Sequence, residues 1–130
     1  MVLDTSAIMA ILLAEPSAER LLAAIELDQI RLISAGTVIE VALVLLRRYG
    51  DAGESQLDRF LNCARVETVP VDSEQVMLAR DAAVRYGRGR SPAALNFGDC
   101  FSYALSVARG EPLLFIGDDF SKADVEVCAW

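Results

Sequence analysis

The sequence predicts an α/β fold, with a mainly parallel central sheet of four or five strands and helices on both faces. Short apolar runs alternate along the chain with longer segments of helical periodicity, which is the first observation. The second is that acidic residues closely follow two of these runs, at what would be the carboxyl edge of a parallel sheet. The third is the length of 130 residues, which suits one domain spanning residues 1–130.

The first part of the chain is expected to form two strands and three helices. The apolar runs at 1–3 and 30–33 are the expected strands. Helices are expected at 6–14, at 17–27 with Ser17 as its cap, and at 37–48. The last of these is apolar nearly all round, which predicts a helix in the middle of the protein.

The second part continues the alternation. A turn is expected at 50–55, followed by a helix whose inner face is formed by Leu57, Phe60, Leu61 and Ala64. The remaining expected elements are a strand at 66–71, a helix at 73–86, a long loop at 87–98, a helix at 99–108, a strand at 113–116 and a last short strand at 125–128.

Charge and composition exclude several classes of function. The chain has 12 Lys and Arg against 19 Asp and Glu, a net charge of −7, whereas a general nucleic-acid coat protein carries a basic field. An enzyme that meets RNA at one basic patch remains possible. The chain has no histidine, which excludes an imidazole base and a histidine-ligated zinc site. Acid–base chemistry therefore needs carboxylates or metal-bound water.

The cysteines and the apolar segments predict a cytoplasmic protein. The three cysteines, Cys63, Cys100 and Cys128, have no C-x-x-C spacing, which is typical of reduced core residues in a cytosolic protein. The apolar run from Ala7 to Ala14 is too short to span a membrane. It also follows an acidic residue rather than a basic segment, so we expect neither a signal peptide nor binding to a membrane.

Five acidic residues are candidates for chemistry, although each has a simpler structural explanation. A carboxylate after the first strand can cap a helix, and the acid within the apolar helix can form a capping box with Thr37. An acid at a helix start interacts favourably with the helix dipole, and paired acids after a strand suit a solvated turn. The candidates are Asp4, Glu40, Asp99, and the adjacent Asp118 and Asp119.

Considered together, these acids predict a metal site. Carboxylates gathered at one sheet edge repel one another and take up protons unless a positive charge is present. The chain offers no histidine and one lysine, Lys122, so a divalent cation is the economical counter-charge. Ligation by oxygen alone favours Mg²⁺ or Mn²⁺ over zinc. Such a site can hydrolyse phosphodiesters with a metal-activated water.

Four segments carry a resemblance to a known family. They are the opening at 1–7, Glu40 about thirty-five residues later, the segment 96–104 and the segment 113–120. Over essentially the whole chain the sequence resembles the PIN-domain ribonucleases, and within them the VapC-type toxins of type II toxin–antitoxin systems. The resemblance implies a PIN-like α/β/α sandwich and a Mg²⁺- or Mn²⁺-dependent endoribonuclease. It also implies a homodimer that a small VapB-type antitoxin neutralises.

The resemblance also assigns roles to individual residues. Asp4, Glu40 and Asp99 match the acidic core of the family, as catalytic and metal-binding residues. Asp118 is the preferred fourth acid because it lies nearer the strand end, with Asp119 as the alternate. The chain departs from the family pattern at Phe115, where a hydroxyl residue is expected. Hydroxyl support for the site is assigned to Thr5 and Ser6.

The basic stretch from Arg80 to Arg90 is the candidate for RNA binding. Arginine pairs with phosphate through two hydrogen bonds, and a tyrosine ring can stack on a base. The simpler explanation is a solvated basic loop on an acidic protein. The candidate RNA-binding residues are Arg85, Tyr86, Arg88 and Arg90.

Two other functions compete with the ribonuclease. A phosphatase of the haloacid-dehalogenase type also has Asp after its first strand, but it needs a second Asp two residues later, where this chain has Ser6. A catalytically silent PIN-like binding module is the other alternative, although it would have little reason to keep every acid. An Asp99→Asn substitution separates the two PIN-like alternatives, because it removes activity only from an enzyme.

Overall fold

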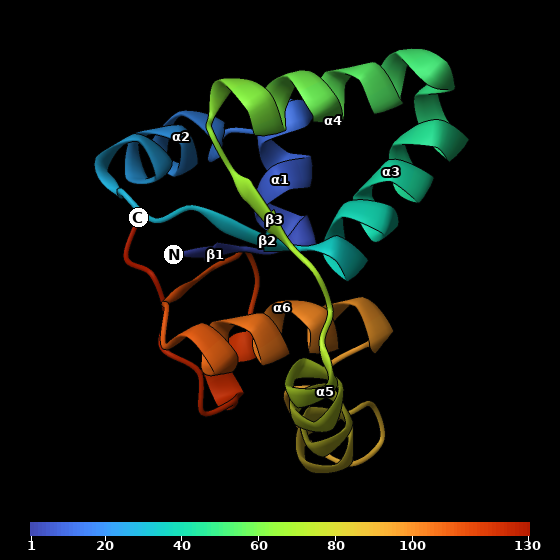
Figure 1. Ribbon diagram of the computed structural model, residues 1–130, viewed down its shortest axis with the longest axis vertical. Helices are drawn as coiled ribbons and strands as arrows, with labels where there is room; N and C mark the ends of the chain where they lie inside the picture. Colours follow the sequence, from blue (N-terminus) through green and yellow to red (C-terminus); the bar gives the residue numbers. More distant parts are fainter.

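The computed structural model describes all 130 residues and contains one four-stranded parallel sheet. The strand order is β3-β2-β1-β4. The strands are β1 (Val2–Leu3), β2 (Leu32–Ser34), β3 (Glu67–Val69) and β4 (Leu113–Leu114). Figure 1 shows the sheet between two groups of helices. The predicted α/β architecture with helices on both faces is therefore confirmed.

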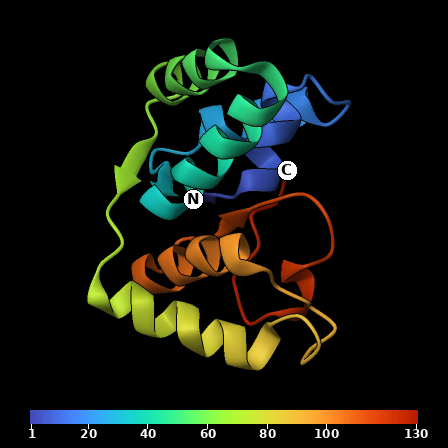
Figure 2. The same ribbon diagram turned by 90° about the vertical axis from the view of Figure 1, so that its right-hand side faces the viewer.

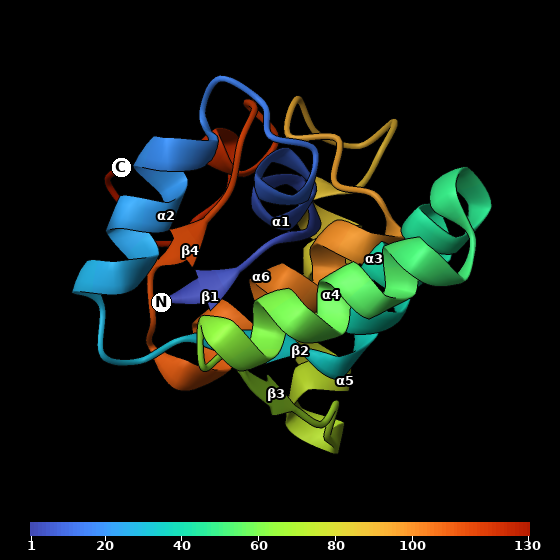
Figure 3. The same cartoon turned by 90° about the horizontal axis from the view of Figure 1, so that it is seen from above.

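Successive side chains of each strand point to opposite faces of the sheet, as strand geometry requires. Leu3, Ile33 and Leu114 pack into one hydrophobic cluster. The helices on that face are α1 (Thr5–Leu12), α2 (Ala18–Leu27), α3 (Ala35–Tyr49) and α4 (Asp51–Cys63). Figure 3 shows these four helices covering the sheet from above.

The other face of the sheet carries the alternate strand residues, Val2, Leu32 and Leu113, in a second hydrophobic cluster. The helices on this face are α5 (Ser73–Tyr86) and α6 (Phe97–Arg109), which lie side by side in Figure 2. The two clusters together form an apolar layer on each side of a sheet whose central strands are buried.

The expected fifth strand at 125–128 does not form. After a short 3₁₀ helix, η1 (Phe120–Lys122), the chain returns beside β4 at a single bridge between Val127 and Leu113. Two backbone hydrogen bonds hold it there, from Leu113 N to Glu126 O and from Cys128 N to Leu113 O. The pairing is too short to count as a strand, so the sheet has four strands.

The turn expected at 50–55 is wrong, because α4 begins at Asp51 and only Gly50, with a φ of 62°, separates it from α3. Gly53 falls within the expected turn but is buried inside α4. A β-carbon there would lie 2.9 Å from the carbonyl oxygen of Leu45, so this glycine permits close packing of α4 on α3.

Helix α3 is also not buried all round. Val41 and Leu45 lie in the core, whereas Ile39, Leu43 and Leu46 are 61%, 48% and 44% exposed along the opposite face. The helix lies at the edge of the molecule, which leaves this face uncovered (Figure 1). These three residues form an exposed apolar stripe, which we call the α3 stripe.

Three smaller expectations can be checked. Ser17 lies at the N-cap position of α2, as predicted, but its dihedral angles are helical and its side chain makes no capping bond. The cysteines are free thiols, but Cys63 is exposed rather than part of the core. None of the helices combines the length and apolar character that crossing a membrane requires.

Candidate active site

A small pocket of about 180 Å³ lies at the carboxyl ends of β1 and β4. This edge is where parallel α/β sheets hold their ligands. The pocket gathers side chains from the starts of α1 and α6, from α3 and from the segment after β4. Its lining residues are Asp4, Thr5, Ser6, Glu40, Asn96, Asp99, Ile116, Asp119 and Phe120.

Asp4 follows β1 directly and is only 3% exposed. Its Oδ2 caps α1 by accepting hydrogen bonds from Ser6 N at 2.9 Å and Ser6 Oγ at 2.7 Å. Its Oδ1 is buried and has no hydrogen-bond partner. The capping explanation therefore accounts for one oxygen and leaves the other available to a ligand, because a buried carboxylate oxygen without a partner is costly.

The two predicted support hydroxyls both contact carboxylates. Ser6 Oγ donates to Asp4 Oδ2 and accepts from Ile116 N at 3.0 Å, so it ties the start of α1 to the end of β4. Thr5 Oγ1 donates to Glu40 Oε2 at 2.5 Å. Each hydroxyl thus fixes the orientation of one acid.

Glu40 lies in the second turn of α3, because the helix begins at Ala35 with Ser34 as its N-cap. The proposed capping box between Thr37 and Glu40 is therefore wrong. Thr37 is buried and its hydroxyl bonds to that of Ser102 on α6 at 3.2 Å. With no capping role of its own, the Glu40 carboxylate lies in the pocket, bound by Thr5.

Asp99 forms a capping box with Asn96 at the start of α6. Its Oδ2 accepts from Asn96 N at 2.6 Å, and its own N donates to Asn96 Oδ1 at 3.1 Å. Burial raises the pKa of Asp99 to about 6, and the negative charges of Asp4, Asp119 and Glu40 add to this rise. The backbone bond from Asn96 opposes it only in part. The pocket thus concentrates negative charge.

The fourth acid in the pocket is Asp119, not the preferred Asp118. Asp118 and Asp119 are both exposed, but Asp118 does not line the pocket, and the bonds at Asp118 use its backbone carbonyl, which accepts from Ser121 N and Oγ. The chain turns after β4 at Gly117, whose φ is 105°, so nearness to the strand end is a poor guide here. Asp119, the alternate predicted from the sequence, is therefore the residue that lines the pocket with the other acids.

The donor set suits a hydrated divalent ion. The four carboxylates and two hydroxyls in the pocket provide oxygen alone, the ligand type that Mg²⁺ and Mn²⁺ prefer. No three acidic side chains come close enough to form a ready-made ligand cluster. Mg²⁺ does not need one, because it usually keeps several waters and is bound by one or two carboxylates. The unpartnered Asp4 Oδ1 is the best-placed direct ligand.

The predicted RNA-binding residues divide into two pairs. Arg85 bonds to Asp81 at 3.2 Å and to Asp124 at 2.7 Å, and its guanidinium lies 4.7 Å from the ring centroid of Tyr86. Arg85 and Tyr86 are thereby occupied by contacts within the protein. Arg88 and Arg90 are exposed on the loop after α5 and form no ion pair.

Sequence reasoning missed two residues of the site, Asn96 and Gly98. Asn96 lines the pocket and caps α6, and the spacing Asn-x-x-Asp is the signal that could have identified a capping box. Gly98 lies against the Glu40 carboxylate. No local pattern reveals this contact, because it joins two helices.

Comparison with known proteins agrees with this geometry. The PIN domain family model matches residues 1–126. Ribonuclease VapC30 of Mycobacterium tuberculosis (strain H37Rv) is 49% identical over 129 residues, which covers 99% of this chain and 98% of that protein. Ribonuclease VapC of Mycolicibacterium smegmatis is 49% identical over 125 residues, covering 96% of this chain and 97% of that protein.

Solved structures share the fold at lower sequence identity. VapC20 of Mycobacterium tuberculosis, described as a sarcin–ricin loop cleaving toxin, has a TM-score of 0.78 at 22% identity and covers 98% of both chains. VapBC2 of Rickettsia felis, solved with a fragment of promoter DNA, has a TM-score of 0.75 at 16% identity, covering 97% of this chain and 94% of that one. The haloacid-dehalogenase alternative is thereby excluded, and this chain belongs to the PIN-domain family, among the VapC ribonucleases.

Proposed function

We propose that this chain is the toxin of a type II toxin–antitoxin pair, and that it is an endoribonuclease dependent on Mg²⁺, which Mn²⁺ can replace. One observation carries the proposal. Asp4, Glu40, Asp99 and Asp119 line one pocket, in which an oxygen of Asp4 is buried without a partner and burial with neighbouring charge raises the pKa of Asp99 to about 6. This arrangement is costly to the protein unless a cation joins it.

Asp4 Oδ1 would be the foremost ligand of the metal, and Glu40, Asp99 and Asp119 would hold it directly or through its bound waters. A divalent ion bound there would supply an activated water and neutralise charge on the scissile phosphate. The pocket contains no histidine, lysine or arginine, so its proton acceptors are carboxylates. An anionic phosphate could not approach four carboxylates without that cation.

The other polar residues of the pocket hold the acids in position. Ser6 fixes one oxygen of Asp4 and thereby the direction of the other, and Thr5 fixes Glu40. The capping box with Asn96 fixes Asp99 through its Oδ2. Because Asp4, Glu40 and Asp99 each have one oxygen held by the protein, these three acids need little rearrangement when substrate binds, which favours catalysis.

RNA and a VapB-type antitoxin are the proposed partners. The support for an antitoxin is the family, together with the fold shared with the VapBC2 complex of Rickettsia felis. We also propose a homodimer, because the α3 stripe exposes three large apolar side chains on one helix face. Leu43→Glu would place a charge in the stripe and should convert a dimer to monomer in sedimentation. The proposed site of action is the cytoplasm.

The decisive experiment is RNA cleavage by the purified, antitoxin-free chain beside an identically prepared Asp99→Asn protein. Each is incubated with a mixed RNA pool and Mg²⁺, Mn²⁺ or EDTA. Asparagine can keep the bond from Asn96 N, so the variant should remain folded. The expected result is cleavage at discrete sites by the wild type with either metal, and none by the variant. Equal cleavage by both proteins contradicts the proposed site, whereas no cleavage by either supports the silent binding module.

A further inference from the structure

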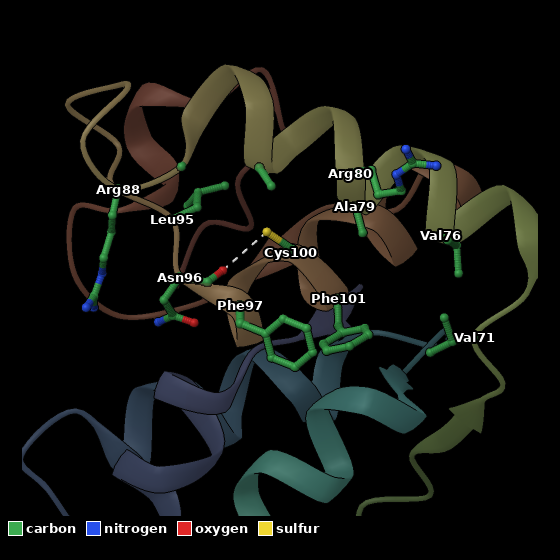
Figure 4. A pocket seen from close by; sticks show the side chains of 12 residues that line it. Val71, Val76, Ala79, Arg80, Arg88, Leu95, Asn96, Phe97, Cys100 and Phe101 are labelled. Carbon is green, nitrogen blue, oxygen red and sulfur yellow. Dashed lines mark hydrogen bonds between the residues drawn. The ribbon is translucent and has the colours of Figure 1, made fainter.

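A second and larger cavity adjoins the acidic pocket. Its volume is about 520 Å³, and it lies between α5 and the start of α6 (Figure 4). Most of its lining is apolar and includes Val76, Leu95, Phe97, Cys100 and Phe101. Its size falls within the range of about 300–1,000 Å³ typical of sites that bind small organic groups. We call it the α5–α6 cavity.

Asn96 lines both the acidic pocket and the α5–α6 cavity. Its Oδ1 accepts the capping bond from Asp99 N, and its Nδ2 has no partner within the protein. The amide therefore presents free N–H donors at the boundary between the two hollows. A group held in the cavity would lie beside whatever bond is held at the acids.

Phe97 is a large aromatic residue at the mouth of this cavity, and it is 82% exposed. Its ring packs edge-on against Phe101, with 4.9 Å between the ring centroids (Figure 4). The contact holds the ring while leaving its surface open to solvent. Exposed rings held in this way serve as stacking platforms for the bases of single-stranded nucleic acids.

Two arginines flank the α5–α6 cavity on opposite sides, Arg88 beside Asn96 and Arg80 on α5 (Figure 4). Both are exposed and neither forms an ion pair. In a chain with a net charge of −7, unpaired cations around an apolar cavity complement an anionic ligand with an apolar part. A nucleotide has both features, because a flat base is joined to charged phosphates.

We propose that the α5–α6 cavity binds one unpaired base of the RNA, immediately beside the phosphodiester held at the acids. Phe97 stacks on the base, the Asn96 amide donates to an oxygen on its edge, and Arg88 and Arg80 contact the flanking phosphates. The inference rests on the proposed function for its RNA substrate. A base paired within a duplex could not enter the cavity.

An apolar segment of a protein partner or of a second copy of the chain is a different occupant, which the charges disfavour. Such a segment would cover the apolar floor but would offer nothing to the guanidinium groups of Arg80 and Arg88, which would lose hydration without a partner. Phosphates on both sides of a base provide that partner. The sedimentation arm of the experiment below tests the alternative.

The test measures binding rather than cleavage and uses the full chain inactivated by Asp99→Asn. Fluorescence anisotropy compares a labelled single-stranded ten-nucleotide RNA with an abasic oligomer of the same backbone and phosphate number. We expect the RNA with bases to bind about tenfold more tightly, a typical effect of stacking one base. Adding Phe97→Ala should abolish the difference between the oligomers, and Phe97→Tyr should retain it. Tyr49→Ala, at another exposed aromatic residue, is the matched control.

Arg88→Gln should weaken binding of both oligomers and reduce the slope of log affinity against log salt by about 1. Arg59→Gln, at an exposed arginine on α4, should change neither. A base preference that survives Phe97→Ala overturns the inference. So does a Phe97→Ala protein that sediments as a smaller species than its parent, because the cavity then belongs to a protein contact.

The two proposals fail separately. A wild-type chain that cleaves RNA with Mg²⁺, while its inactivated form binds both oligomers alike, contradicts the base site alone. A wild-type chain that cleaves no RNA, while its inactivated form loses base preference on Phe97→Ala, contradicts the ribonuclease and supports the base site.

Discussion

The Glu40 carboxylate lies directly against Gly98, so closely that a β-carbon at position 98 would overlap both carboxylate oxygens. Glu40 belongs to α3, and Gly98 immediately precedes Asp99 at the start of α6. One turn before Glu40 on α3 and one turn after Gly98 on α6, the hydroxyl oxygens of Thr37 and Ser102 lie 3.2 Å apart. This contact between the helices therefore sets the position of Glu40 relative to Asp99.

Gly98→Ala should remove cleavage while leaving the fold intact. The new methyl group must displace Glu40 from Thr5 and from the pocket, and overpacking of this kind costs about 1–3 kcal/mol of stability. The backbone at Gly98 is helical, so alanine adds no conformational strain of its own. RNA cleavage with Mg²⁺ and urea unfolding of the same preparation measure the two effects.

The control for this prediction is the same substitution in a Glu40→Ala background. Without the carboxylate there is nothing for the methyl group to displace, so Gly98→Ala should cost far less stability there. Alanine also has the higher helix propensity. An equal loss of stability in both backgrounds would show that the glycine serves some other contact.

Asp99→Asn should stabilise the metal-free protein at neutral pH. Burial and the charges of Asp4 and Asp119 raise the pKa of Asp99 from 3.8 to about 6. The carboxyl of Asp99 therefore binds a proton more tightly in the folded state than in the unfolded chain. The stability that this bound proton contributes is complete below pH 3.8 and is lost as the pH rises through about 6. Asparagine is neutral at every pH, so the free energy of unfolding of Asp99→Asn at pH 7 should exceed that of the wild type by on the order of 2–3 kcal/mol.

The same comparison at acid pH provides the check. Near pH 4 the Asp99 carboxyl is protonated in the folded protein, so the two proteins should unfold at nearly the same urea concentration in EDTA. The difference should grow steadily through pH 5 and 6. A wild type whose stability to urea at pH 7 equals or exceeds that of the variant would contradict the raised pKa of Asp99.

Millimolar Mg²⁺ or Mn²⁺ should raise the melting temperature of the wild type by a few degrees. An ion that binds only the assembled pocket stabilises the folded state by mass action and relieves the repulsion among the acids. The gain should be smaller at pH 5 than at pH 7, because protonated Asp99 competes with the ion. Asp99→Asn should show little gain, and NaCl of equal ionic strength controls for screening. A wild-type melting temperature that does not move contradicts the metal site.

Much of the fold and part of the site could be predicted because local patterns determine them. Buried strands are recognised in the sequence as apolar runs. Asp4 lies where a strand ends, and Asp99 lies where a helix begins. Such positions depend on a few neighbouring residues. The sequence therefore identified both acids and the edge of the sheet at which they lie.

Other features depend on contacts between distant segments and could not be predicted. The turn expected at 50–55 is wrong because the sequence does not reveal the close approach of α4 to α3 at Gly53. Arg85 was predicted to contact RNA as part of a basic stretch. The sequence does not reveal that its guanidinium pairs with Asp124, which lies 39 residues away in the chain. The choice between Asp118 and Asp119 depends on the backbone conformation at Gly117 and on the burial of Phe120.

That choice gives a direct prediction at two adjacent residues. Asp119→Asn should reduce cleavage strongly, because it removes a carboxylate from the pocket lining. Asp118→Asn should leave cleavage within about twofold of the wild type, because Asp118 does not line the pocket and a substitution at an exposed position away from the site perturbs little. The two variants carry the same change in charge and act as controls for one another. Loss of cleavage in Asp118→Asn alone would restore the original preference.

Asp124→Asn should lower stability without altering RNA binding. Asp124 accepts hydrogen bonds from Tyr103 Oη at 2.6 Å and from Arg85 at 2.7 Å, and these bonds lower its pKa to about 2. Its contribution to stability is therefore present above pH 3.8 and is lost as the pH falls through about 2. Because the side chain is 53% exposed, solvent screens the pair, and we expect a loss of about 0.5–1 kcal/mol at pH 7. The loss should stay constant from pH 5 to 8 in urea unfolding and shrink below pH 4.

The salt dependence of RNA binding by Asp124→Asn should match that of the wild type. A changed salt dependence would mean that Arg85, released from Asp124, contacts the RNA after all.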